Sequence, residues 1–392
     1  MTPVSGSWPL EKAEPESVGL CATRLQHVSR LMQDYVDAGT IAGSITLVAR
    51  RGKIAHLECC GLMDIEQQKP MREDAIFRLY SMTKIVTAAA VLMLMEEGRF
   101  LLTTPVSEFL PEFKDVRVGV TGADGRQELV RPRREVNVHD LLTHMSGLSY
   151  DFMAEAKERG LDLATFVKEL CKRPLHHQPG QTWLYGMSTD VLGRLVEVIA
   201  GSDFDVFLQE RIFEPLKMTD TGFFVPPEKV ERLGWLYRPD DDGKLVSAED
   251  RDTSPYLSKP ALPSGGGGLV STTSDYLSFA QMLVNGGELN GVRLLGPKTV
   301  ELMHQDHLPP RHPPLEVNNR AFGLGVSVVR NLGETKQLAS IGEFGWGGAA
   351  GTQVWIDPAE QMITLIMLQI RPREKFRLMD QFKQTAYQAI ID

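Results

Sequence analysis

The chain has 392 residues, of which 42% are hydrophobic and 24% charged, and its formal net charge is −9. This composition is ordinary for a soluble globular protein, and the length suffices for two domains or for one domain with a large insertion. The negative charge argues against nucleic acid or an anionic membrane surface as a partner, because both bind basic patches.

Two features of the chain favour a cytoplasmic location. The N-terminal stretch MTPVSGSWPLEKAEPES has no basic start followed by an apolar run, and no run of 18 apolar residues exists, so we expect neither a secretory signal nor a membrane span. The cysteines form no disulfide framework, and adjacent Cys59 and Cys60 would point to opposite faces of a strand. We therefore expect a reducing compartment and no bound metal.

The N-terminal part predicts a helix, two strands and a second, buried helix. Apolar residues recur at helical spacing over 23–38, and two runs, 44–49 and 54–60, have the pattern of strands joined by a turn at 51–53. The segment that begins near Ser81 and ends before Gly98 is apolar nearly all round, which indicates a buried helix.

Helical pieces and long, proline-punctuated loops follow over residues 100–195, where the clearest helices cover 138–148 and 188–201. After a glycine-rich stretch, strands are expected at 322–329, 352–356 and 362–370. A last amphipathic helix carries these residues on its apolar face: Phe376, Met379, Phe382, Ala386 and Ile390.

This order of elements predicts an α+β fold. In it, one antiparallel sheet is flanked by the terminal helices and receives an inserted, mostly helical domain. We expect residues 1–90 and 196–392 to form the discontinuous α/β domain and residues 91–195 the helical one. The periodicity leaves the strand order open.

Ser81 and Lys84 form the first candidate site. A hydroxyl is a poor nucleophile until a base takes its proton, and a spacing of three at a helix start puts both side chains on one face. Backbone N–H groups and the positive dipole end of the helix lie beside the serine. Burial lowers the pKa of a lysine, so we expect Lys84 in its neutral, proton-accepting form. An exposed lysine one turn from an N-cap serine is the alternative, but eleven apolar or small residues follow Lys84.

Two later segments complete this candidate site. A Ser–Lys pair needs a second proton carrier, and Tyr185 lies between a Pro-Gly turn and a helix, where loop residues face clefts. The segment 344–351, FGWGGAAG, precedes a strand, so its glycines allow close approach of a ligand and Trp346 is expected to line a pocket. A tyrosine packed at a helix start and a β-bulge beside a buried tryptophan are the structural alternatives.

Ser81-x-x-Lys84, then Tyr185, then a glycine-rich strand is the order found in class C β-lactamases, D-Ala-D-Ala peptidases and family VIII carboxylesterases. The chain resembles this superfamily over most of its length, through the segments LLTHMSGL, PGQTWLYG, GGGGLVSTTSDYLSFAQML and WGGAAGTQVWIDP. The resemblance implies a β-lactamase-like fold with the site at the junction of two domains. It also implies Ser81 as the nucleophile and Lys84 and Tyr185 as a joint general base. The backbone N–H groups of Ser81 and Ala349 would form the oxyanion hole.

Two departures from the superfamily pattern favour esters. β-Lactamases and peptidases carry Lys-Thr-Gly or His-Thr-Gly on the C-terminal strand, which gives a cation for the substrate carboxylate. Here the candidate substrate-binding residues are Trp346, Gly347 and Gly348. In addition, Met187 stands two residues after Tyr185, where these enzymes commonly have an asparagine. The Trp-Gly-Gly form is similar to that of family VIII esterases and related acyltransferases.

We therefore predict a cofactor-free carboxylesterase that cleaves small carboxylic esters through an acyl-enzyme on Ser81. Short or medium acyl chains are expected, because Trp346 should crowd the pocket. The alternatives are a β-lactamase or D-residue peptidase, an acyltransferase to a bulky alcohol, and an inactive relative that only binds ligands or partners. The oligomeric state is left open.

Other signals carry less weight. No serine lies in a Gly-x-Ser-x-Gly elbow, which argues against an α/β-hydrolase. His304, His307 and His312 match no strong zinc pattern and predict a surface loop, whereas His144 is expected to order a loop through hydrogen bonds. The glycine run from Gly265 lacks the ending of a phosphate loop and predicts close packing near the site. Residues 240–262 are expected to help shape the pocket.

Overall fold

The computed structural model describes residues 8–122, 125–310, 312–315, 319–372 and 377–392. Phe376 of the predicted last helix lies outside this part, as do the first seven residues of the N-terminal stretch. Most of the predicted helices and strands are confirmed, with ends that differ from the prediction by at most four residues.

The first and last strands of the chain meet in one nine-stranded sheet. Its order is β1-β3-β2-β17-β16-β15-β14-β13, with β4 added on β3. Strands β2 and β17 pair antiparallel, so the two ends of the chain form the middle of the sheet. Only the β1–β3 pairing is parallel. The strand bounds are β1 Glu11–Lys12, β2 Gly43–Arg50, β3 Lys53–Asp64, β4 Lys69–Pro70, β13 Ala321–Phe322, β14 Ser327–Val328, β15 Phe344–Gly347, β16 Gln353–Asp357 and β17 Met362–Leu368.

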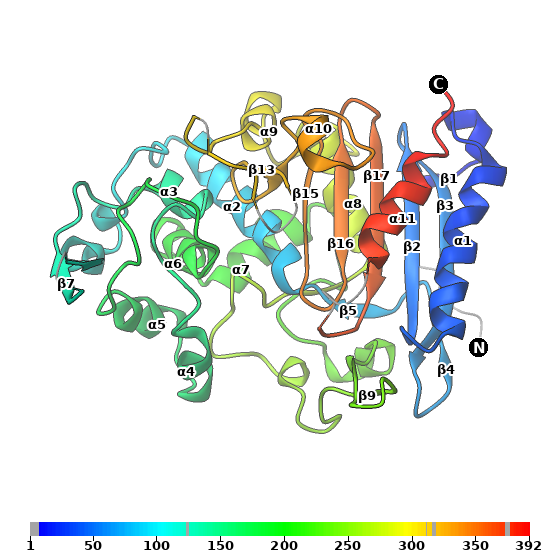
Figure 1. Ribbon diagram of the computed structural model, residues 1–392, viewed down its shortest axis with the longest axis horizontal. Helices are drawn as coiled ribbons and strands as arrows, with labels where there is room; N and C mark the ends of the chain where they lie inside the picture. Colours follow the sequence, from blue (N-terminus) through cyan, green and yellow to red (C-terminus); the bar gives the residue numbers. More distant parts are fainter. Residues whose placement is uncertain (1–7, 123–124, 311, 316–318, 373–376) are drawn as a thin grey trace.

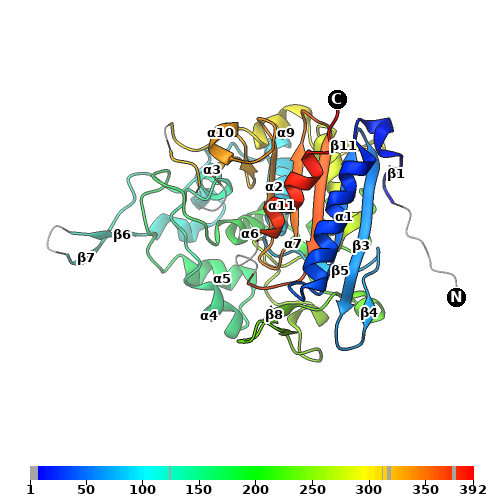
Figure 2. The same cartoon turned by 45° about the vertical axis from the view of Figure 1, so that its right-hand side comes forward.

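The terminal helices α1 (Ala22–Asp37) and α11 (Leu378–Tyr387) lie side by side on one face of this sheet (Figure 1; Figure 2). Helix α8 (Thr273–Val284) packs on the opposite face, against β16 and β17. Because both faces are covered, every residue of β2 is buried. The predicted α+β fold, an antiparallel sheet flanked by the terminal helices, is thereby confirmed.

The remaining helices gather beside the sheet, with helix α2 at their centre (Figure 1). Helix α2 (Thr83–Glu96) is buried through Leu94 and packs against α6 (Ser188–Ala200). The other elements are β5 Ile76–Arg78, β6 Val118–Thr121, β7 Gln127–Val130, α3 Val138–Leu142, α4 Met153–Glu158, α5 Leu163–Leu170, α7 Phe204–Leu208, β8 Tyr237–Pro239, β9 Leu245–Ser247, β10 Val270–Thr272, β11 Glu288–Leu289, β12 Val292–Arg293, α9 Pro297–Met303 and α10 Leu332–Thr335. The division of the chain into domains at residues 90 and 195 stays a prediction. Among the described residues, no helix is both long and apolar enough to cross a bilayer.

Two predicted elements are wrong in extent. The helix predicted over 138–148 ends at Leu142, because His144 and Gly147 adopt left-handed backbone conformations (φ 55° and 87°). The strand predicted over 322–329 is two short strands, β13 and β14, joined by a turn at Gly325 (φ 79°). A Cβ at Gly325 would lie 2.5 Å from the Ala88 side chain of α2, so close packing against the central helix breaks the strand.

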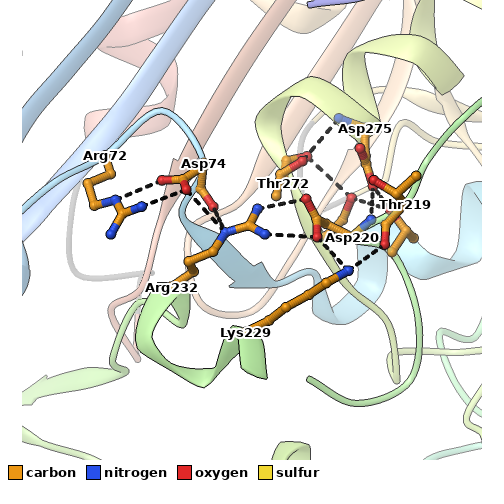
Figure 3. Close-up of polar contacts among 10 residues, drawn as sticks. Arg72, Asp74, Thr219, Asp220, Lys229, Arg232, Thr272 and Asp275 are labelled. Carbon is orange, nitrogen blue, oxygen red and sulfur yellow. Dashed lines mark hydrogen bonds and ion pairs between the residues drawn. The ribbon is translucent and has the colours of Figure 1, made fainter. Parts of the chain in front are cut away.

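A network of ion pairs joins the segment before β5 to α8 (Figure 3). Arg232 contacts Asp74 at 3.3 Å and Asp220 at 2.6 Å. The backbone N–H of Asp220 and the hydroxyl of Thr221 then donate to one oxygen of Asp275 on α8, at 2.7 and 2.9 Å. Because β5 begins just after Asp74 and ends just before the turn that holds Ser81, this network fixes the strand that precedes the candidate nucleophile.

Asp275→Asn is expected to make stability less dependent on pH. Burial, together with the charge of Asp220, raises the pKa of the Asp275 carboxyl to about 6, well above the ordinary range of an aspartate. The folded state therefore holds this proton more tightly than the unfolded state does. As pH rises from about 4 through about 6, the wild-type protein should lose roughly 3 kcal/mol of its free energy of unfolding from this group.

Asparagine keeps an oxygen that accepts the same two hydrogen bonds and has no charge to bury. Urea denaturation should therefore show Asp275→Asn gaining stability relative to wild type at pH 7.5 but not at pH 4. Asp241→Asn, at an exposed position, should track wild type at both values. Equal relative stability of Asp275→Asn at the two pH values would contradict the assignment.

Candidate active site

Ser81 lies in a single 3-10 turn, Tyr80–Met82, between β5 and α2. The segment that leads from β5 into this turn is held by the N–H of Leu79, which donates to the Leu269 carbonyl at 2.9 Å. Tyr80 adopts a left-handed conformation (φ 46°), which is uncommon outside glycine and makes the turn into the helix sharp. Ser81 is half-buried, whereas the helix that follows is buried. The hydroxyl thus lies at the positive end of a buried helix.

Lys84 lies one turn further along, and its side chain is fully buried. Its Nζ lies 3.2 Å from Ser81 Oγ and 2.9 Å from the Tyr150 hydroxyl, and it also donates to the carbonyl of Gly266. An ammonium has three N–H groups, so these partners use all of them. The predicted proximity of Ser81 and Lys84 is therefore present, and the lysine is held in place by two further groups.

The expectation of a lowered Lys84 pKa is wrong. Burial alone lowers it, but the charges that Tyr185, Tyr150 and Asp190 carry when ionised outweigh burial, and the pKa is raised. The hydrogen bond to Tyr150 acts in the same direction. The resting form of Lys84 is the ammonium, so a proton acceptor for Ser81 has to be found among its neighbours.

Tyr185 lies in the loop just before α6 and packs against Lys84 through its ring. The lysine Nζ is 4.7 Å from the ring centre, and the Tyr185 hydroxyl accepts a hydrogen bond from Trp346 Nε1 at 2.9 Å. Gly186 makes this possible, because a Cβ there would lie 2.1 Å from the Leu148 carbonyl. The Trp346 N–H and the Lys84 ammonium thus both lie against Tyr185, one at its oxygen and the other at its ring.

Tyr150 is a site residue that sequence reasoning missed. It follows α3, its hydroxyl accepts from Lys84, and its ring meets that of Tyr185 edge to face with centres 5.5 Å apart. The residue as a whole is 37% exposed, so Tyr150 reaches from the surface down to the buried lysine. One signal could have found it: Tyr150 and Tyr185 are the only tyrosines between residues 91 and 195, and Tyr150 stands two residues after the LLTHMSGL segment.

The end of β15 meets the segment that carries Ser81. Gly348 is so close to the Leu79 carbonyl that a Cβ would lie 2.2 Å from it, and the Thr352 hydroxyl donates to the same carbonyl at 3.0 Å. Within the described part of the chain, neither Ser81 nor Ala349 donates its backbone N–H to a carbonyl. Ala349 is also half-exposed between buried neighbours. Both N–H groups are thus available to a ligand oxygen.

Trp346 is only 6% exposed, which leaves little of it to line a pocket. Its ring packs edge to face on Phe322 and against Tyr185, to which it donates its N–H. Trp346 is therefore placed to orient Tyr185. Of the strand residues expected to bind substrate, Gly347 and Gly348 are buried beside the Ser81 segment.

The glycine run that begins at Gly265 packs directly on α2, as predicted. The Gly265 carbonyl accepts from Thr87 at 2.8 Å, and the Gly266 carbonyl accepts from Lys84. A Cβ at Gly266 would lie 2.5 Å from the Asp190 carboxylate, which in turn accepts the Gly266 N–H at 3.1 Å. Glycine is therefore required where this backbone passes Asp190 to present its carbonyl to Lys84.

The histidines depart from the predictions in part. His144 orders a loop by a hydrogen bond, as predicted, but through its backbone: its carbonyl accepts the Leu184 N–H at 2.9 Å. Its ring packs among aromatic side chains, and neither ring nitrogen has a hydrogen-bond partner among the described residues. Burial and the Lys84 charge lower its pKa, which keeps the ring neutral. His307 pairs with His139 at 3.1 Å. Among the described residues, no cluster of histidine, cysteine or acidic side chains could hold a metal ion.

This fold, with Ser81 and Lys84 at the start of its central helix, defines a β-lactamase-like serine hydrolase. The family model described as Beta-lactamase matches residues 28–388, so the chain belongs to the β-lactamase family. The predicted resemblance to its esterase branch is confirmed by the following relatives.

Protein Rv1367c of Mycobacterium tuberculosis (strain ATCC 25618 / H37Rv) is 36% identical over 359 residues, which cover 87% of this chain and 89% of the relative. Esterase EstB of Burkholderia gladioli is 35% identical over 264 residues, or 60% of this chain and 64% of EstB. The solved structure of EstCE1, a hydrolase with promiscuous acyltransferase activity, superposes with a TM-score of 0.80 at 25% identity, over 93% of this chain and 99% of EstCE1.

Proposed function

We propose that the protein is a carboxylesterase that cleaves small carboxylic esters through an acyl-enzyme on Ser81. The observation that carries this proposal is the contact between Lys84 Nζ and Ser81 Oγ at 3.2 Å, with the phenols of Tyr150 and Tyr185 against the same ammonium. The similarity to a named esterase, EstB, and to the hydrolase EstCE1 supports the reaction class.

In the proposed mechanism, Tyr185 is the proton acceptor and Lys84 stabilises its ionised form. As Ser81 Oγ attacks the ester carbonyl, its proton moves to the phenolate, directly or through the lysine. The backbone N–H groups of Ser81 and Ala349 bind the oxyanion of the tetrahedral intermediate. Tyr185 then returns a proton to the leaving alkoxide, and water attacks the acyl-enzyme by the same route in reverse.

The composition of the site favours esters over β-lactams and peptides. Trp346 and two glycines stand where the resembled β-lactamases place a cation, and Met187 stands where they place an amide. Both changes remove groups that would bind an anionic amide substrate. The four cysteines are free thiols, which fits the cytoplasmic location that we also propose.

The experiment that tests this function is serine-directed labelling combined with a substrate comparison. A fluorophosphonate should label the protein on Ser81 by peptide mass mapping, and Ser81→Ala should not be labelled. The wild-type protein should hydrolyse 4-nitrophenyl butyrate much faster than a cephalosporin. A preference for the cephalosporin would favour the β-lactamase alternative, and failure of the reagent to label Ser81 would favour an inactive relative.

Acyl transfer to an alcohol is a second candidate, because EstCE1 is described as a hydrolase with promiscuous acyltransferase activity. It uses the same acyl-enzyme with an alcohol in place of water. Product analysis in the presence of an added alcohol would reveal a new ester if transfer competes with hydrolysis.

A further inference from the structure

We propose that Arg371 binds a carboxylate group of the substrate, so that the enzyme prefers esters carrying a free carboxylate on the acyl or alcohol part. This inference rests on the proposed ester hydrolysis at Ser81. It assigns a substrate class and a specificity residue to that site. Arg371 follows β17 and lies between that strand and α11 in the chain.

Arg371 reaches the segment that carries the nucleophile. Its guanidinium carbon lies 5.6 Å from the ring centre of Tyr80, the residue immediately before Ser81. Tyr80 cannot swing away freely, because it sits at the strained turn into α2 and its ring meets Tyr256 edge to face at 6.5 Å. The cation is thus held over the residue adjoining the candidate nucleophile.

The backbone of Arg371 is tied to the candidate oxyanion turn. The N–H of Ile370 donates to the carbonyl of Ala350 at 2.9 Å, and Ala350 directly follows Ala349. Consecutive Cα atoms are about 3.8 Å apart, so the Arg371 backbone lies on the order of 10 Å from the Ala349 N–H. The long side chain of Arg371 can span the distance between its own backbone and the Ala349 N–H. Arg371 is therefore anchored beside the segment that carries Ser81 and beside the turn that carries the Ala349 N–H.

The positive charge of Arg371 is available to a ligand. Arg371 is exposed, and in the described ranges no carboxylate forms an ion pair with it. Glu249, whose charge acts on Tyr80, is already held by the buried Arg78 at 2.6 Å and by Ser254 at 2.8 Å. The other cation of the site, Lys84, has all three N–H groups in use. Arg371 hydrogen-bonds the Tyr80 side chain but has no carboxylate partner among the described residues, so its charge can meet an anionic substrate group.

The chemistry of this position fits a carboxylate. A guanidinium presents paired N–H donors that match the two oxygens of a carboxylate, and its charge does not titrate near neutral pH. The buried Trp346, Gly347 and Gly348 offer no cation on β15 itself. Arg371 would supply it from the segment that follows β17, in a protein whose net charge of −9 otherwise repels anions.

The test uses two pairs of esters that differ in one carboxylate. In 3-acetoxybenzoate and 3-acetoxybenzamide the difference lies on the alcohol part, and in mono-4-nitrophenyl glutarate and 4-nitrophenyl butyrate on the acyl part. We expect wild-type kcat/KM to favour the carboxylate member of at least one pair by about tenfold, and the preference to shrink on raising sodium chloride to about 0.5 M. Arg371→Gln should abolish that preference by lowering kcat/KM for the carboxylate member about tenfold more than for its neutral counterpart, and Arg371→Lys should retain part of the preference.

Arg293→Gln is the matched control, since it removes an exposed arginine from the distant β11–β12 hairpin. It should leave both pairs unchanged. Absence of a preference in both pairs would overturn the inference, as would an equal loss on charged and neutral esters in Arg371→Gln. Hydrolysis of the neutral members, and its loss in Ser81→Ala, tests the proposed function separately.

A binding measurement keeps the inference testable without turnover. Isothermal titration calorimetry would compare 3-acetamidobenzoate, the amide analogue of the first ester, on wild type and Arg371→Gln. The dissociation constant should be about tenfold weaker for the variant. Equal affinity, or no binding by the wild-type protein, would overturn the role of Arg371 even if esterase activity were found.

Discussion

Lys84→Met is expected to lower kcat for 4-nitrophenyl butyrate by about a thousandfold or more, which stopped-flow or steady-state absorbance assays would measure. The substitution removes the ammonium that contacts Ser81 Oγ and lies over the ring of Tyr185. Without that charge the proposed transfer of the Ser81 proton to Tyr185 loses its electrostatic support, and Ser81 keeps its proton. Both steps of the acyl-enzyme cycle depend on the same transfer, so acylation and deacylation should fall together.

The Lys84→Met protein should nevertheless stay folded. Methionine has nearly the same length, and exchanging a fully buried charge for an apolar group often costs little. The main loss is the donor to the Gly266 carbonyl, for which an unsatisfied buried acceptor costs about 1–3 kcal/mol. Thermal unfolding should therefore move by only a few degrees.

Lys383→Met is the matched control, because Lys383 is the other lysine that is deeply buried among the described residues. It lies on the buried face of α11, is 1% exposed and contacts the fully buried Glu343 at 2.8 Å. Burial, with the charge of Arg320, lowers its pKa to about 8. Its removal should lower stability while leaving kcat of the folded protein unchanged. Full activity in Lys84→Met, or equal losses of kcat in both variants, would contradict the role of Lys84.

The parts of the fold that sequence predicted are those in which periodicity and burial agree. The run after Ser81 is apolar all round, and α2 is buried from Thr83 to Leu94. The terminal strands and helices were predicted because each has one regular apolar pattern. The helix over 138–148 was overextended, since the left-handed conformation of His144 arises from tertiary packing that no residue pattern records.

The site residues likewise divide into those that the sequence predicts and those that depend on tertiary structure. Ser81, Lys84 and Tyr185 come from recognisable motifs, and the fold brings all three together. Tyr150 was missed because its contact with Lys84 depends on how the loop after α3 turns back toward α2. The charge state of Lys84 was wrong for a related reason. Burial can be inferred from an apolar helix, but the opposing charges come from segments up to about 100 residues away in the sequence.

Tyr185→Phe is expected to lower kcat by about a hundredfold to ten-thousandfold at every pH where the wild type is active. It removes the proposed proton acceptor and leaves the Trp346 N–H without its partner. Tyr150→Phe should have a smaller effect on kcat and a distinct effect on pH dependence. The hydrogen bond that Tyr150 accepts favours the charged form of Lys84, so its loss should lower the lysine pKa. The alkaline limb of kcat/KM should therefore move to lower pH in Tyr150→Phe.

A third tyrosine, Tyr35, provides the control for these two variants. Tyr35→Phe removes a phenol on α1 that bonds only Gln381 on the outer helices, at 2.6 Å, and should leave kcat and its pH profile unchanged. If Tyr150→Phe lost more activity than Tyr185→Phe, with no shift of the alkaline limb, the phenol that contacts Lys84 directly would be the proton carrier. Tyr185 would then serve to orient Trp346. We instead expect Tyr185→Phe to lose more activity than Tyr150→Phe. Of these two tyrosines, Tyr185 combines an indole N–H at its oxygen with an ammonium at its ring.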